Sequence, residues 1–152
     1  MTSIKAIWDQ LVADTVALGV YADARALPVN VISDLKFLDH FPGIQMPACL
    51  IVFMGRDKTI RGSADERDGR WNAIFVARDA DGSAYAENIA RVEAWEAALC
   101  DREILSDSVV VLGTAQISPA VTNPRFSVYQ LAFSTRQAEE RVMGTGPPED
   151  ED

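Results

Sequence analysis

Apolar side chains recur every three or four residues in two segments of the chain, a spacing that predicts two amphipathic helices. The first helix is expected over residues 3–18, where Ser3 or Thr2 can cap its start and Gly19 can end it. The second is expected over residues 85–99. Each helix has a single apolar face, so each is expected to pack against a sheet or a neighbouring element.

Four apolar runs of strand length complete the pattern. The run 48–54 is continuously apolar, which predicts a central strand that is covered on both faces. The run 71–78 is its simplest antiparallel partner. Two further strands are expected after the second helix, over residues 109–117 with an interruption, and over residues 125–136.

The stretch 20–46 has the weakest pattern in the chain. Residues 20–27 are compatible with a short strand. Residues 29–41 mix apolar and charged side chains between prolines, which leaves open two short extended pieces or one short helix.

Sixteen residues, 55–70, separate the first two strands and contain nine charged side chains of both signs and three glycines. Connections in compact domains have a median length of about four to six residues, and a much longer one is usually functional or disordered. This segment is therefore predicted to be a long loop at the tip of a β-hairpin, and the part of the chain that reaches a partner protein.

The fold class that follows is α+β. We expect a two-layer domain in which a mostly antiparallel sheet has two main helices packed on one face and a long β-hairpin loop. Residues 1–137 are expected to form this single domain, and residues 138–152 an acidic, disordered tail. Ile74 and Val128 would then lie on the other sheet face without a covering element, which favours oligomerisation.

Charge narrows the range of functions. The formal net charge is −9, of which residues 138–152 contribute −5 through six acidic side chains and one basic one. A domain this acidic is a poor candidate for binding phosphate backbones, which requires clustered lysine and arginine. It suits a surface that nucleic acid passes without adhering. No apolar run approaches the ~18 residues of a membrane-spanning helix.

The candidate chemical motifs predict no catalytic, metal or cofactor site. His40 is the only histidine and lacks a nucleophile elbow, so a turn or surface histidine is the favoured interpretation. Cys49 and Cys100 are predicted to be reduced, semi-buried thiols. Lys58 lacks the glycines of a phosphate-binding loop, and the turn at 79–83 fails the calcium-loop template. The chain is therefore expected not to be an enzyme and to need no cofactor.

The element order, taken with certain residues, resembles the tail terminator (tail-completion) proteins of long-tailed bacteriophages and Mu-like prophages. The resemblance covers most of residues 3–137. The matching features are the opening helix at 4–18, the proline and apolar strand at 46–52, the long hairpin, the helix at 85–99, and the closing strands at 109–117 and 126–134.

The resemblance implies an architectural role in a virion that is assembled in the cytoplasm of a bacterial host. Such proteins form a ring, typically a hexamer, at the head-proximal end of the tail tube, where they end tube polymerisation and join the tail to the neck. The implied partners are further copies of the chain, the tail tube protein and a neck or connector protein. DNA passes through the lumen without specific binding.

Under this hypothesis the charged hairpin is the main candidate contact surface. Trp71 is either a core residue or an interface anchor, since tryptophan is enriched at interfaces. Tyr129 marks the closing strand, which is expected to contact a neighbour by edge pairing. The candidate interface residues are Arg56, Lys58, Arg61, Asp65, Glu66, Arg67, Arg70, Trp71 and Tyr129.

Three alternatives remain open from the residues alone. The first is another neck or head-completion (head-tail connector) protein of similar size. The second is a small enzyme or binding module, which requires a pocket with convergent polar groups. The third is a regulatory partner protein whose acidic chain binds a basic one.

Overall fold

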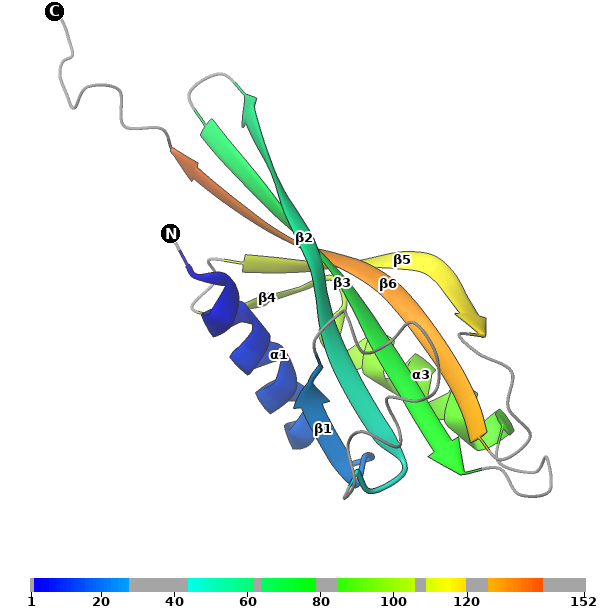
Figure 1. The fold of residues 1–152 in the computed structure, drawn as a ribbon. Helices are drawn as coiled ribbons and strands as arrows, with labels where there is room; N and C mark the ends of the chain where they lie inside the picture. The colour runs from blue at the N-terminus through cyan, green and yellow to red at the C-terminus, as the bar shows by residue number, and fades with distance from the viewer. Residues whose placement is uncertain are drawn as a thin grey trace, which may run out of the picture.

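The computed structural model describes residues 2–27, 44–61, 64–78, 85–105, 109–119 and 126–140 (Figure 1). These residues form two helices that pack on a six-stranded, mostly antiparallel sheet, so the predicted α+β class is confirmed. The elements are α1 (Ile4–Leu18), β1 (Asp23–Ala26), β2 (Ala48–Arg61), β3 (Ala64–Arg78), α3 (Tyr85–Leu99), β4 (Arg102–Ile104), β5 (Val109–Pro119) and β6 (Phe126–Glu140).

Local capping explains the bounds of α1. The Ser3 hydroxyl accepts a hydrogen bond from the backbone N–H of Ala6 at 3.1 Å, which satisfies one of the free donors of the first turn. Gly19 ends the helix with φ of 78°, and its N–H donates to the carbonyl of Val16. Both roles agree with the sequence prediction. Neither described helix is long and apolar enough to cross a membrane.

The strands are arranged in the order β1-β2-β3-β6-β5-β4. β1 runs parallel to β2, and every other neighbouring pair is antiparallel. The short strand expected within residues 20–27 is β1, whereas residues 28–43, including His40, lie outside the described residues. The turn at 79–83 lies outside them as well.

One strand, β4, has no counterpart in the sequence prediction, which places no strand between the second helix and residue 109. The backbone turns at Asp101, which has φ of 59° and whose N–H donates to the carbonyl of Val111 at 2.6 Å. This reversal lets Arg102–Ile104 pair with the start of β5.

The prediction that residues 55–70 form a loop is wrong. β2 continues to Arg61, β3 begins at Ala64, and the ladder between them is registered from Gly55–Arg70 to Arg61–Ala64. Pairing on the second side of β3 supplies the reason: β6 continues to Glu140, opposite Ala64. Backbone hydrogen bonds to two neighbours hold β3 extended here without an apolar face.

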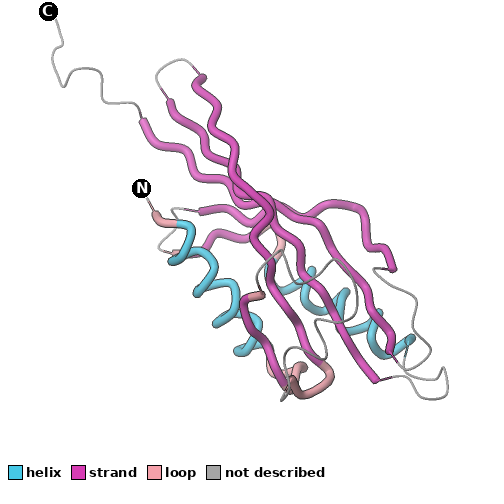
Figure 2. Tube along the Cα trace, viewed as in Figure 1, coloured by secondary structure: helices cyan, strands magenta, loops and turns pink. Residues whose placement is uncertain are grey.

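We call this three-stranded extension the arm; it comprises residues 55–61, 64–70 and 134–140. Figures 1 and 2 show it continuing past the helices as a twisted ribbon. Residues 138–140 belong to β6 rather than to a separate tail, and residues 141–152 lie outside the described residues. The ladder between β2 and β3 shifts its register between Phe53 and Gly55, where the arm begins.

Below the arm, β2 and β3 are buried on both faces of the sheet. Between the sheet and the two helices lies a core that includes Trp71, Phe75 and Trp95. On the other face, Ile74 and Val128 are each only 3% exposed, so the expectation that they lack a cover is wrong. Ile44 and Met46, which precede β2, pack against this second cluster together with Phe126.

Candidate functional site

The arm holds seven of the nine candidate interface residues. Arg56, Lys58 and Arg61 lie on β2, and the remaining four lie on β3: Asp65, Glu66, Arg67 and Arg70. The charged residues that follow one another along the sequence thus lie side by side on two adjacent strands of the arm. It is the most prominent projection of the described chain (Figure 2).

One face of the arm is held by cross-strand ion pairs. Arg136 on β6 lies opposite Asp68 on β3, and its Nε and Nη2 donate to the two carboxylate oxygens at 3.0 and 3.1 Å. Arg70 Nε lies 3.2 Å from Asp57 Oδ2, which links β3 to β2. The hydrogen bond to Asp68, together with its charge, raises the pKa of Arg136 above its ordinary value. Because these pairs are largely exposed, they contribute little to the stability of the fold.

The opposite face of the arm is basic near its base. Arg56 and Lys58 are two residues apart on β2 and exposed, and Lys58 lies opposite Arg67 in register. The Nε atom of Arg67 is buried and has no hydrogen-bond partner within the described part of the chain. Arg56, Lys58 and Arg67 therefore lie on one face of the arm, because side chains alternate along each strand. A face rich in positive charge suits contact with an acidic surface.

Gln137 connects this face to the body of the protein. Its side chain is 4% exposed and exchanges two hydrogen bonds with the backbone of Thr2, at 3.1 and 3.0 Å. The start of α1 is thereby tied to β6 within the arm. The sequence gives no signal for this contact, because the partners are 135 positions apart.

The arm also presents an isolated apolar side chain. Ile60 is 51% exposed and lies near the end of β2, among charged residues. A large apolar side chain in a polar surface is what a partner covers at an interface core. Sequence reasoning did not select Ile60.

Trp71 and Tyr129 lie elsewhere. Trp71 is 1% exposed, and its indole N–H donates to the hydroxyl of Thr135 at 2.9 Å, so it is a core residue. Tyr129 is half-buried against the same core, opposite Phe75 of β3 and Pro119 of β5. Because β6 is flanked by strands on both sides there, it offers no free edge at Tyr129, and the edge-pairing interpretation for this residue is wrong.

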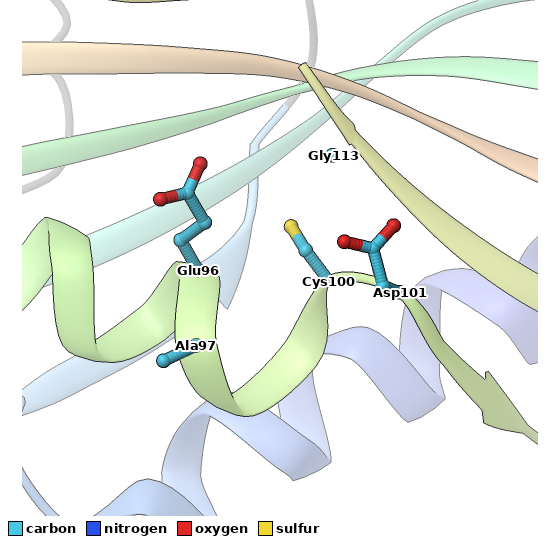
Figure 3. Close-up of a pocket in the computed structure, with 5 residues that line it drawn as sticks. All are labelled: Glu96, Ala97, Cys100, Asp101 and Gly113. Atoms are coloured by element: carbon cyan, nitrogen blue, oxygen red, sulfur yellow. The ribbon is translucent and has the colours of Figure 1, made fainter. Parts of the chain in front are cut away.

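A separate pocket of about 440 Å³ lies between the end of α3 and β5 (Figure 3). The Cys100 thiol lies in it between the carboxylates of Glu96 and Asp101. Burial, followed by these two negative charges, raises the pKa of Cys100 to about 12. The thiol is therefore protonated at neutral pH, and a protonated thiol is a poor nucleophile. No group of His, Cys, Asp and Glu that could hold a metal ion occurs among the described residues.

Replacing Cys100 with alanine is expected to weaken the loss of stability at alkaline pH. The unfolded thiol has a pKa near 9.0 and the folded one a pKa of about 12, so its stabilising contribution is complete below pH 9 and disappears as pH rises toward 12. Urea midpoints measured between pH 8 and pH 11 should fall less steeply in the variant than in the wild type. Identical slopes of urea midpoint against pH in the two proteins would contradict the raised pKa of Cys100. Cys49 and Tyr21, whose pKa values burial also raises, leave a residual slope in both proteins.

Comparison with known proteins yields a likeness in fold. No family model matches the chain, and no curated protein matches it. Among solved structures, the fold is similar to a chain of "Virion of native gene transfer agent (GTA) particle", with a TM-score of 0.55 and 16% sequence identity. The likeness covers 90% of this chain and 96% of that one, so it extends over nearly the whole of both.

Proposed function

We propose that this protein is a structural component of a phage-like virion, and that it forms a ring, expected to be a hexamer, at the head-proximal end of the tail tube. In this role it ends tube polymerisation and joins the tail to the neck. The observation that carries the proposal is the fold shared with a virion chain over 90% of this protein. The resemblance of the sequence to tail terminator proteins adds the position within the particle.

The physical properties of the chain support an architectural role. The arm supplies a projecting surface with charges of both signs and an exposed Ile60, which suits contact with further copies, the tail tube protein and a neck or connector protein. The net charge of −9 disfavours adhesion of DNA to a lumen that DNA must traverse. No step in this function requires a cofactor or a reaction.

Deleting the gene for this chain in the producing cell tests the proposal. Electron micrographs are expected to show tails of uncontrolled length that are not joined to heads, and wild-type protein supplied from a plasmid should restore joined particles. Tails of normal length that fail only to join heads would instead indicate another neck or head-completion protein. Normal, joined particles in the absence of the chain would overturn the virion role.

A further inference from the structure

The arm has two outer edges. β1 pairs with β2 only from Ala48 to Ile51, so no described strand covers the outer edge of β2 along the arm. On the other side, β5 pairs with β6 no further than Arg136, which leaves residues 137–140 of β6 with β3 as their described partner. Outer edges of this kind expose backbone donors and acceptors that favour pairing with another strand.

The two edges have opposite charge at the same height along the arm. The register places Arg61 of β2, Ala64 of β3 and Glu140 of β6 in one row, and Ile60, Asp65 and Glu139 in the next. The β2 edge ends in a segment that contains Lys58 and Arg61, whereas the β6 edge ends in two glutamates. Within one copy the edges cannot meet, because β3 separates them by about 10 Å, two strand spacings.

We propose that the outer edge of β2 in one copy of this protein pairs with the outer edge of β6 in the next copy, with the arms pointing the same way. Both strands run antiparallel to β3, so the pairing between copies is parallel. Each copy uses two different surfaces, and such a head-to-tail contact closes into a ring when the rotation between copies permits. That the copies form a ring rests on the proposed function, whereas the strand pairing between copies rests on the two edges of the arm.

Charge selects this arrangement over symmetric ones. Two β2 edges would bring Lys58 and Arg61 against their own copies, and two β6 edges would bring glutamates against glutamates; like charges across an interface are unfavourable. Only the mixed pairing matches basic residues with acidic ones. It also places a second strand beside Ile60, which is 51% exposed in the single chain.

Two charge-reversed variants test the pairing. Lys58→Glu with Arg61→Glu makes both edges acidic, and Glu139→Lys with Glu140→Lys makes both basic. Each variant alone is expected to self-associate about tenfold more weakly than wild type, or worse, in size-exclusion chromatography with light scattering. An equimolar mixture is expected to recover the wild-type assembly, because each acidic edge then meets a basic one.

A matched control reverses two charges away from the arm. Glu87→Lys with Glu93→Lys changes exposed positions on α3 and is expected to leave self-association unchanged. Failure of the mixture to recover assembly, or equal weakening by the control, would overturn the pairing. If rings form normally in every variant, the pairing is wrong while the proposed ring stands.

Cysteine cross-linking keeps the inference testable if the free protein associates weakly. Ile60→Cys and Glu139→Cys in separate chains are expected to form a disulfide-linked dimer when mixed and oxidised, and little when either is oxidised alone. A chain with both substitutions should give a ladder of multimers, because Cα atoms about 10 Å apart within one copy exceed the ~7 Å limit of a disulfide. No cross-linking in the mixture would overturn the pairing. If the mixture cross-links but the deletion strain makes normal tails, the strand pairing is supported and the proposed function is wrong.

Discussion

Replacing Trp71 with alanine is expected to lower the free energy of unfolding by about 3–5 kcal/mol, the range for truncating a large buried aromatic side chain. For a domain of this size that corresponds to a fall in Tm of roughly 10 °C. Trp71 is 1% exposed, and its ring lies 5.0 Å from that of Phe53 and 5.9 Å from that of Trp8, centroid to centroid. The truncation would leave a cavity between α1 and the sheet, just below the base of the arm.

The hydrogen bond of Trp71 adds to this effect and allows a graded control. The indole N–H donates to the Thr135 hydroxyl, which is itself buried, and alanine leaves that hydroxyl without this donor. Gly69 leaves room for the bond, since a Cβ there would lie 2.7 Å from both the indole nitrogen and the hydroxyl oxygen. Trp71→Phe keeps most of the ring volume and is expected to lose only about 1–2 kcal/mol.

Chemical denaturation of the three proteins measures both values. If Trp71 were an interface anchor, alanine would reduce self-association while leaving the urea midpoint of the monomer unchanged. A decrease of less than about 1 kcal/mol in the free energy of unfolding of Trp71→Ala would contradict the core assignment, because truncating a fully buried tryptophan costs more than this.

The helices and apolar strands could be predicted because their patterns reflect burial within this domain. The stripe of α1 faces the sheet through Ile7 and Leu11. Residues 48–52 are buried on both faces, as their continuous apolar character predicts, whereas Met54 at the end of the run is 38% exposed. In each case the local pattern of apolar and polar residues matches which side chains are buried.

The arm could not be predicted in this way. Its strands contain Asp, Gly and Lys, which are depleted in strands, and no apolar alternation marks a buried face. Its extended form depends on pairing of β3 with β6, a strand about 70 residues later in the chain, and on cross-strand contacts such as Arg136 with Asp68. Strand order depends on the same long-range pairing, so the sequence pattern predicts an edge at Tyr129 although β6 is internal there.

The role of residues 55–70 as a contact surface stays a prediction, whereas their predicted loop structure is wrong. Charge of both signs in residues 55–70 indicated a contact surface, and the structure places that segment in a projection (Figure 1). The charge pattern of residues 55–70 gives no sign of β6, the third strand of the arm. It therefore gives no sign of the acidic edge that complements the basic one. From residue 138 onward the acidic composition predicts a tail, so the sequence gives no sign that β6 continues to Glu140.

Shortening the arm is expected to abolish ring assembly without unfolding the protein. The change removes residues 58–67 and joins Asp57 to Asp68, which lie opposite each other in register, through Asn-Gly, the sequence preferred in two-residue hairpin turns. The removed residues contribute no side chain to either core cluster, so the free energy of unfolding should stay within about 1 kcal/mol of wild type, as for surface changes. Self-association and the joining of tails to heads should both be lost.

The matched control keeps the arm at full length and replaces only residues 62 and 63 with Asn-Gly. Because it has the same new turn but retains both edges, it should assemble and join tails as the wild type does. Light scattering reports assembly, urea denaturation reports folding, and electron micrographs report tail length. A shortened protein that still forms rings and joined tails would show that contacts on the body of the domain suffice. The arm would then be a projection with some other partner, because the β2 edge at residues 58–61, the exposed Ile60, and Lys58 and Arg67 of the basic face would all be dispensable for the ring.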